Sequence, residues 1–342
     1  MNNINVIADF INQWHTPFVE EAIFGIGNAE EIAERVNTFC ATHLGISVAD
    51  YLFYESSQGA VFGIQLSDGH RVVLKAHQPD RPLDFLSATY KVQRYLADHG
   101  YPCPRPLLGP TPIGYGHATV EELIDTGVYT DAHDPAIRRL MAEKLAQLAS
   151  VTGDIKDIAG LRSTALGRQL PEGILWPTPH SRIFDFAATI SGAEWIDTLA
   201  YEARQKLAHS VGKMVIGHTD WSVKHFRFWD GNVCIIYDWD SLALEHETVI
   251  VGEAARGFTM TWHLDVLITP GQDEARAFVE EYETFRGKAF TDDERATIAA
   301  AATYALAYSA RCEHCIDPRT GDFPMGSHRE ALARYGDRYL AP

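Results

Sequence analysis

The spacing of apolar residues divides the chain into a strand-rich first part and a helical second part. Over residues 1–47, apolar side chains recur every three or four positions, which predicts helices. Three apolar runs follow in YLFYESSQGAVFGIQLSDGHRVVLKAH, separated by ESSQG and SDGH. The Asp68-Gly69 pair between two of these runs is typical of a β-hairpin turn. A helical pattern comes next, in LDFLSATYKVQRYLADHG, and ends at Gly100.

A proline-rich segment and further helical segments complete the pattern. YPCPRPLLGPTPIG carries five prolines in fourteen residues, which predicts an extended connector. HATVEELID predicts one more strand. From Asp134 onward, helices are predicted over 135–150, 192–212, 247–268, 273–286 and 291–315, with a loop-like stretch over 160–190.

A shift in composition near residues 124–130 indicates two lobes. The first lobe covers 1–124 and consists of a helical extension (1–48) followed by a sheet and a helix (49–124). The second lobe covers 125–342 and is mainly helical. The length of 342 residues also favours more than one core. The predicted fold class is therefore α+β.

One predicted hairpin interrupts the helical second lobe. In HFRFWDGNVCIIYDW the strands are Phe226–Trp229 and Val233–Tyr237, and the turn is Asp230-Gly231. A hairpin places its two open ends side by side. The residues before its first strand should therefore lie beside the residues after its second.

Acidic residues flank this hairpin on both sides. Asp220 and His225 precede the first strand, and Asp238 and Asp240 follow the second. Converging carboxylates repel each other, so they need a bound cation or a proton. Oxygen ligands of this kind suit Mg²⁺ together with phosphate oxygens. The alternative is a set of aspartates that only cap turns at the surface.

A lysine on a predicted strand gives the first lobe a candidate anion site. Lys75 lies within RVVLKAH, among apolar residues, where an ammonium group needs an anion. The preceding hairpin loop, ESSQGAVFG, offers Gly59, Gly63 and two serines, and small residues let backbone N–H groups approach phosphates. The order of these features along the chain, from this loop to the carboxylate hairpin, is more specific than any one of them.

Composition and charge limit the classes of partner. With 46% hydrophobic and 22% charged residues, the chain is typical of a globular protein. A net charge of −17 disfavours nucleic acid and anionic membranes, and it either suits a cationic ligand or serves only solubility. We find no signal-peptide pattern and no apolar run long enough to span a membrane. Five scattered cysteines favour reduced thiols and a cytoplasmic location.

Two motifs around the hairpin carry a resemblance to a known family. The family has H-G-D-x-x-x-x-N, then a hairpin, then I-D-W-[DE]; this chain has HTD from His218 to Asp220 and DWD from Asp238 to Asp240. It thus resembles the aminoglycoside phosphotransferase and choline kinase-like family, the small-molecule relatives of protein kinases. The resemblance covers about residues 50–315. It implies a protein-kinase-like two-lobe fold, with a small β-rich N-terminal lobe and a larger helical C-terminal lobe.

The resemblance also implies ATP and Mg²⁺ as cofactors. Asp220 would orient the acceptor hydroxyl and accept its proton late in the transfer. Asp238 would hold Mg²⁺, Lys75 would pair with the α- and β-phosphates, and His218 would support the loop. The other nucleotide contacts would come from Ser56, Ser57, Gln58 and Gly59 in the phosphate-covering loop, and from Glu122 and Leu123 beside adenine.

The chain departs from the family at His225, which stands where the motif has a metal-binding Asn. Imidazole is a poor ligand for Mg²⁺ and a better one for transition metals. Several alternatives remain open: His225 helps only indirectly, one metal ion is lost, catalysis is impaired, His225 donates a proton to phosphate, or it only hydrogen-bonds Asp220. We favour a retained but modified metal site of Asp238, His225 and Asp240, in which Asp240 compensates for the missing Asn.

A second departure concerns the glutamate that usually pairs with the strand lysine. Thr89 falls near its place, and between Arg81 and Gly100 the only acidic residues are Asp84 and Asp98. The expected ion pair is therefore missing from the helix, and Lys75 has either another anchor or none without nucleotide.

Acceptor-binding residues are expected in the helical lobe. Asp185, Glu253 and Asp265 would bind an amine, His180 and Arg256 would bind an acid, and Trp176 and Trp262 would form an apolar wall. For each of them, a place in the core or on a solvated helix face is the alternative. The net charge of −17 favours a cationic acceptor such as an aminoglycoside or an amino alcohol.

We therefore predict an ATP-dependent phosphotransferase that acts on a hydroxyl group of a small molecule. A nucleotide-binding pseudokinase that acts through partners is the alternative, which His225 and the missing helix glutamate would favour. Retention of Asp220, Asp238 and Lys75 together argues against it. Transfer of a nucleotidyl group is a third alternative that no residue favours. The oligomeric state and the choice between ATP and GTP stay open.

Overall fold

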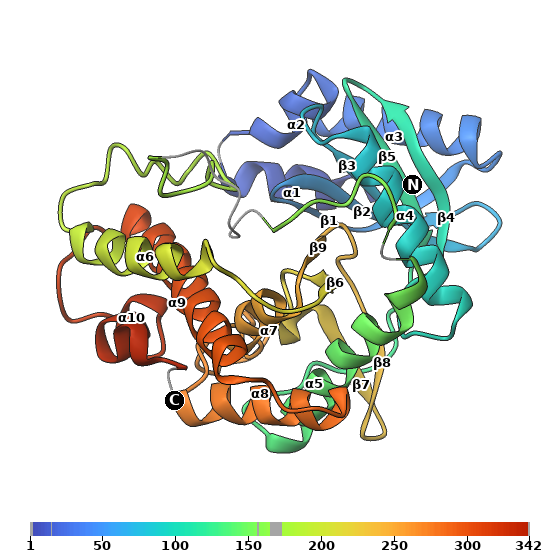
Figure 1. Cartoon of the computed structure of the whole chain (residues 1–342). Helices are drawn as coiled ribbons and strands as arrows, with labels where there is room; N and C mark the ends of the chain where they lie inside the picture. Colours follow the sequence, from blue (N-terminus) through green and yellow to red (C-terminus); the bar gives the residue numbers. More distant parts are fainter. Residues whose placement is uncertain (1–2, 15, 156, 165–172, 341–342) are drawn as a thin grey trace. The chain divides into compact units, whose positions relative to one another are not determined.

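Three helices precede a five-stranded antiparallel sheet in the first unit, Met1–Asp125 (Figure 1). The helices predicted over residues 1–47 are confirmed as α1 (Asn5–Trp14), α2 (Phe18–Phe24) and α3 (Ala29–His43). The strands are β1 (Val48–Ser56), β2 (Gly59–Leu66), β3 (Arg71–His77), β4 (Pro106–Ile113) and β5 (Gly116–Glu122), in the spatial order β1-β2-β3-β5-β4. The predicted helix after β3 is α4 (Leu83–Asp98). This computed structural model describes residues 3–14, 16–155, 157–164 and 173–340.

An apolar core holds the first three helices to the sheet. Ile7 of α1, Phe24 of α2 and Val36 of α3 are buried in one cluster with Phe62 of β2. The rings of Phe24 and Phe62 make an edge-to-face contact, with their centroids 6.2 Å apart. Burial of side chains of this size contributes about 1.5–3 kcal/mol each. The helices over residues 1–47 are therefore an integral part of the first unit.

The proline-rich segment differs from its prediction as a connector. It forms β4, which pairs with β5 at the edge of the sheet. Proline has no N–H group to donate, so an edge strand tolerates it where a central strand would not. The pairing slips twice, between Pro106 and Leu108 and between Leu108 and Thr111, which accommodates the prolines at 106, 110 and 112.

Helices make up most of the second unit, Thr126–Pro342 (Figure 1). They are α5 (Pro135–Val151), α6 (Glu194–Leu207), α7 (Glu247–Ala255), α8 (Gln272–Arg286), α9 (Asp292–Ile316) and α10 (His328–Tyr335). Short 3-10 turns lie at Thr152–Ile155, Val223–His225 and Gly336–Arg338. The long helix α9 contacts α6, α7 and α10. Of the helices that the structure describes, none combines the length and the apolar character that crossing a membrane would require.

Both predicted hairpin turns are confirmed. Asp68-Gly69 joins β2 to β3, and Asp230-Gly231 joins β7 (Phe226–Trp229) to β8 (Asn232–Ile236). In the second turn φ is 47° at Asp230 and 70° at Gly231. Positive φ at both central residues gives a tight turn whose twist matches that of the strands, and Asp and Gly adopt it readily.

The second unit contains two strands that the apolar pattern does not predict. β6 (Met214–His218) lies just after the segment predicted as a helix over 192–212, and it pairs with β9 (Leu242–His246). The helix predicted over 247–268 ends at Ala255. It ends there because the following backbone bonds elsewhere: Phe258 O and Met260 O accept hydrogen bonds from Val223 N and Lys224 N.

Candidate active site

Backbone hydrogen bonds join the loop that carries Asp220 to the segment after the hairpin. Beyond the paired strands β6 and β9, Thr219 N donates to Ser241 O at 2.8 Å. At the base of the β7–β8 hairpin, Tyr237 N donates to His225 O at 2.9 Å. The two ends of the hairpin therefore lie side by side, as the turn at its tip requires.

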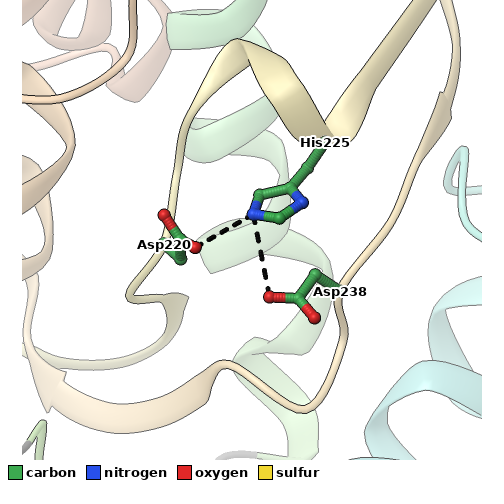
Figure 2. A group of neighbouring side chains, drawn as sticks. All are labelled: Asp220, His225 and Asp238. Carbon is green, nitrogen blue, oxygen red and sulfur yellow. Dashed lines mark hydrogen bonds and ion pairs between the residues drawn. The ribbon is translucent and has the colours of Figure 1, made fainter. Parts of the chain in front are cut away.

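Asp220, His225 and Asp238 come together at this place (Figure 2). One ligand atom of each lies within 4.8 Å of the other two. His225 Nε2 is 3.0 Å from Asp220 Oδ2 and 3.7 Å from Asp238 Oδ2, so the imidazole stands between the two carboxylates. Among the described residues, Asp240 is not one of this group, although it follows Asp238 by two positions.

Lys224 is a member of the site that the sequence reasoning missed. Its ammonium group lies 2.8 Å from Asp220 Oδ2, the same oxygen that His225 contacts. The ammonium group also lies over the ring of Trp262, 4.6 Å from its centroid. The spacing D-x-x-x-K in a turn was the available signal, because residues four apart lie on one side of a helical turn.

These contacts hold Asp220 in its ionised form. Burial raises the pKa of its carboxyl, but the charges of Lys224 and His225 and their hydrogen bonds lower it more. The net result is a pKa well below the usual range of an aspartic acid. Ser222 Oγ donates to the other oxygen, Oδ1, at 3.2 Å. Asp220 is thus a carboxylate that is oriented at both oxygens.

His218 is a buried, neutral support for the same loop. Burial lowers its pKa to about 4, with a further lowering by His225. Asp220 N donates to Nδ1 at 3.2 Å, so the proton of the neutral ring is on Nε2, which faces Tyr237 O at 3.3 Å. The ring also meets Trp239 edge-on, with centroids 5.7 Å apart. This agrees with the supporting role expected for His218.

Asp238 has an unusual backbone conformation for a residue with a side chain. Its φ is 68°, in the left-handed region that Asp tolerates better than most residues. Ser241 Oγ donates to Asp238 Oδ2 at 2.9 Å. Buried Trp239 comes next, and its Nε1 donates to Ile236 O. The conformation turns the chain at the end of β8 and directs the Asp238 carboxylate toward His225 (Figure 2).

In the first unit, Lys75 has an acidic partner on a strand instead of on the helix. Lys75 Nζ lies 3.5 Å from Glu121 Oε1, and both side chains are nearly buried, with exposures of 12% and 7%. Gln93 of α4 donates to Glu121 Oε2 at 2.7 Å. Thr89, the position expected by comparison with the family, is buried and donates to Leu86 O. The sequence reasoning missed Glu121, although it correctly found no glutamate on the helix.

The strand register explains why Glu121 reaches Lys75. Lys75 is opposite Thr119, and Val73 is opposite Glu121, so all four side chains lie on the same face of the sheet. Glu121 is thus the diagonal neighbour of Lys75 on the adjacent strand. Only the pairing of β3 with β5 could show this, because the two residues are 46 positions apart in the chain.

The predicted phosphate loop is the tight turn between β1 and β2. Ser57 N donates to Gly59 O, and the Gln78 side chain donates to Gln58 O. A Cβ atom at Gly59 would lie 2.7 Å from Ala76 O, so this position admits only glycine without a shift of the backbone. Ser56 is opposite Ala60 at the end of the β1–β2 pairing.

The two residues expected beside adenine lie at the end of β5. Glu122 N donates to Arg105 O and Leu123 N donates to Arg71 O. Since both N–H groups already have partners, a purine base would be bound there through the carbonyl oxygens or side chains.

The donor chemistry of the Asp220–His225–Asp238 group fits Mg²⁺ only in part. Mg²⁺ prefers oxygen ligands, which Asp238 and Asp220 supply. His225 offers a nitrogen instead, and that nitrogen already contacts Asp220 Oδ2. The fit is therefore best at Asp238, whereas His225 is placed to hold the carboxylates rather than to bind a hard cation.

Comparison with known proteins places this arrangement in a family. The model of the phosphotransferase enzyme family matches residues 55–285, more than half of the chain. The chain belongs to the phosphotransferase enzyme family. Membership makes it a phosphotransferase of the small-molecule kinase class. No curated protein sequence matches it.

Solved structures of phosphotransferases share its fold. An amicoumacin kinase in complex with AMP-PNP, Ca²⁺ and its ligand is similar at TM-score 0.59 and 14% identity, covering 92% of this chain and 97% of that one. A macrolide 2′-phosphotransferase from Brachybacterium faecium is similar at TM-score 0.54 and 15% identity, covering 91% of this chain and 98% of that one. A spectinomycin phosphotransferase in complex with ADP and spectinomycin is similar at TM-score 0.52 and 12% identity, covering 90% of this chain and 93% of that one. The predicted kinase-like α+β fold is thereby confirmed.

Four of the residues predicted to bind the acceptor of this phosphotransferase lie in different surroundings. Asp185 is exposed and accepts a hydrogen bond from Ala188 N, as a turn aspartate does. Asp265 is exposed, and Trp262 is 70% exposed against Lys224. Glu253 is buried, and burial raises its pKa to about 8, so its carboxyl is mostly uncharged at neutral pH. None of the three acidic residues is both buried and ionised, as binding of an amine in a closed site would require.

Proposed function

We propose that the protein transfers the γ-phosphoryl group of ATP to a hydroxyl group of a small molecule. The observation that carries this proposal is the ionised, doubly oriented carboxylate of Asp220. A phosphotransferase needs mainly positioning and charge neutralisation at the reacting groups. Positioning comes from the contacts of Lys224 and His225 with Asp220. Charge neutralisation comes from Lys224 and from a cation at Asp238.

In the proposed reaction, the hydroxyl oxygen of the acceptor forms a bond to the γ-phosphorus. The bond from that phosphorus to the bridging oxygen of ADP breaks, and ADP leaves with the electron pair. Asp220 accepts a hydrogen bond from the hydroxyl and takes its proton late, because a carboxylate with a depressed pKa is a weak base. The nearby ammonium group of Lys224 offsets negative charge that develops on the transferred group.

Mg²⁺ is proposed as the cation of the site. When bound, it would neutralise phosphate charge and so lower the barrier to transfer. Asp238 is the residue best suited to hold it, through oxygen. That Asp240 is a second metal ligand stays a prediction. His225 would hold the carboxylates in position rather than bind the metal.

The nucleotide contacts are assigned to the first unit. We propose that Lys75, held by Glu121, pairs with the α- and β-phosphates. Ser56, Ser57, Gln58 and Gly59 would cover the phosphates, and Glu122 and Leu123 would contact adenine. At Gly59 the backbone approaches Ala76 O too closely for any larger residue. At Glu122 and Leu123 the N–H groups are already bonded, so adenine would have to be bound through other atoms.

For the acceptor, we propose a small molecule with a free hydroxyl group, as in the solved relatives named for amicoumacin, spectinomycin and macrolides. The net charge of −17 favours a cationic acceptor at long range. Net charge governs attraction at a distance, however, and the groups in contact with the acceptor govern its class.

A titration with ATP, with and without Mg²⁺, tests the proposal by thermal shift. Ligand at 100 times its dissociation constant stabilises the protein by about 2.7 kcal/mol. We expect a shift that depends on Mg²⁺, and ADP formation when hydroxyl compounds are added. Binding of ATP with no ADP formed under any condition would favour the pseudokinase alternative. No shift with ATP, but one with GTP, would change the donor.

A further inference from the structure

Arg256 is a partly buried guanidinium with an incomplete set of partners. It lies at the C-terminal end of α7, and its Nη1 donates to Ser309 Oγ of α9 at 3.0 Å. Its Nε is buried and makes no hydrogen bond to any residue that the structure describes. No carboxylate in that part of the chain forms an ion pair with it. Taking a guanidinium partly out of water without an anion is unfavourable, so a ligand anion is expected here.

The position of Arg256 links it to the loop that carries Asp220. Phe258 O and Met260 O, just after Arg256, accept hydrogen bonds from Val223 N and Lys224 N at 2.8 and 3.3 Å. The Asp220 carboxylate is near enough to raise the pKa of Arg256, although burial has the larger and opposite effect. Asp220 cannot serve as the partner, because its Oδ2 is already shared by Lys224 and His225 and no ion pair to Arg256 forms.

The acidic residue one turn before Arg256 does not neutralise it. Glu253 is three positions earlier on α7, on the same side of the helix. It is buried, its Oε1 accepts a hydrogen bond from Thr164 at 2.9 Å, and its Oε2 has no hydrogen-bond partner among the described residues. The pKa near 8 leaves it mostly protonated at neutral pH. Glu253 raises the pKa of Arg256, but at neutral pH its mostly protonated carboxyl offsets only part of the charge of the guanidinium.

His180, in the loop before α6, contacts Tyr308 of α9 and is a candidate for a second hydrogen-bond donor. Tyr308, next to Ser309, contacts both the backbone N and the Nδ1 of His180, at 3.2 and 2.9 Å. Burial lowers the pKa of His180, so the ring is neutral at pH 7. In the tautomer in which Nδ1 accepts from the Tyr308 hydroxyl, the ring proton is on Nε2, for which no described residue provides an acceptor. The Asp220 carboxylate raises the pKa of His180 and the Lys224 ammonium group lowers it, so the ring is within electrostatic range of both.

We propose that the acceptor carries a carboxylate, which pairs with Arg256 while its hydroxyl group lies at Asp220. The guanidinium suits this role because its N–H groups form a planar fork that matches the two oxygens of a carboxylate. The proposal rests on the proposed function for the place of the hydroxyl. It selects an acid over the cationic acceptor that the net charge favours.

Matched pairs of hydroxyl compounds, with and without a carboxylate, test this. The pairs are gluconate and sorbitol, galacturonate and galactose, and serine and ethanolamine. Binding to the full chain is measured by ligand-observed NMR without nucleotide, and ADP formation is measured with Mg²⁺ and ATP. We expect at least one acid to bind about tenfold or more tightly than its neutral or amine counterpart. Equal binding within every pair, including no binding of either member, would overturn the proposal.

Variants of Arg256 identify the group responsible. Arg256→Gln is expected to abolish the preference for acids, and Arg256→Lys to keep only part of it, because a lysine lacks the fork. Arg334→Gln, on an exposed side chain of α10, is the matched control and should change nothing. Ser309→Ala removes the hydrogen bond to Nη1 but keeps the guanidinium charge, so it should retain most of the preference. A preference that survives Arg256→Gln in a protein of unchanged Tm contradicts the proposal.

Three further outcomes separate this site from other possibilities. If Arg256 serves the phosphates of the nucleotide, Arg256→Gln weakens AMP-PNP binding and leaves the acid preference unchanged, which also overturns the proposal. If acids bind through Arg256 but ATP gives no thermal shift, the carboxylate site stands and the proposed use of ATP as donor fails. If ATP gives a thermal shift but no acid is preferred, the use of ATP stands and the carboxylate site fails.

Discussion

Each unit holds one group of charged side chains suited to phosphate chemistry, and the two groups differ in how exposed their carboxylates are: Glu121 is 7% exposed and Asp220 is 34% exposed. In the first unit, Lys75 and Glu121 form an ion pair whose side chains are nearly buried, and Gln93 donates a hydrogen bond to Glu121. In the second unit, Lys224 and His225 both contact one oxygen of Asp220, whose side chain is 34% exposed.

This difference separates a group that holds the fold from a group that does chemistry. A buried pair is costly to break, because the remaining charge has no water to solvate it. Two hydrogen-bond donors on one partly exposed carboxylate contribute little to stability but strongly favour its ionised form. We therefore expect changes in the first group to affect stability and nucleotide affinity, and changes in the second to affect turnover.

Asp220→Asn should have the largest effect. The amide cannot accept the proton of the hydroxyl, so we expect turnover to fall about a hundredfold or more, with ATP affinity nearly unchanged. ADP formation and thermal shift with ATP measure the two quantities. Asp230→Asn, at the exposed tip of the hairpin, is the matched control and should keep full turnover. Full turnover in Asp220→Asn itself would remove Asp220 from the catalytic role.

Lys75→Met should cause the next largest effect, on stability. It leaves Glu121 buried without a cation, so we expect the free energy of unfolding to fall by about 3 kcal/mol in urea denaturation. Lys224→Met should lower it by less than about 1 kcal/mol, because Asp220 retains His225 and water.

A double variant, Lys75→Met with Glu121→Gln, separates stability from binding. It removes both charges and retains an acceptor for Gln93, so most of the lost stability should return while ATP affinity stays low. Equal losses of stability in Lys75→Met and Lys224→Met would show that the two groups do not differ as described.

Lys224→Met should shift the pH dependence of turnover. Lys224 lowers the pKa of Asp220 in the folded protein, and Asp220 acts as a carboxylate. Without the ammonium group that pKa rises, so activity should be lost at a higher pH as the solution is acidified. We expect the acidic limb of kcat to move upward by about one pH unit. Lys206→Met, at an exposed pair with Asp337, is the control and should leave the profile unchanged.

His225→Asn should have the smallest effect on turnover. The variant restores the residue of the family motif, with an oxygen in place of a nitrogen. We expect the apparent affinity for Mg²⁺ to rise about tenfold, since oxygen suits this ion better, with turnover within about threefold of the original protein. Titration of ADP formation with MgCl₂ measures both. A fall in turnover beyond about tenfold would mean that the imidazole itself takes part in the reaction.

Local patterns were enough to predict much of the fold and the centre of the site. The turn at Asp230-Gly231 brings Asp220, His225 and Asp238 together because a tight hairpin leaves its ends adjacent whatever surrounds it. The helices with regular apolar spacing and the first hairpin were predicted for the same reason. Mistakes arose where a partner far along the chain decided the outcome, as in β4, β6 and β9, whose strand character depends on the strands they pair with.

The sequence alone therefore determined the family resemblance, the carboxylate hairpin and the strand lysine, because each depends on residues close together in the chain. The tertiary structure alone decided that Glu121 pairs with Lys75, that α7 stops at Ala255, and that Lys224 points to Asp220. It also decided the surroundings of Glu253 and Arg256 on α7. Burial and strand register set the charge and the partners of such groups, and both depend on contacts between residues that are distant in sequence.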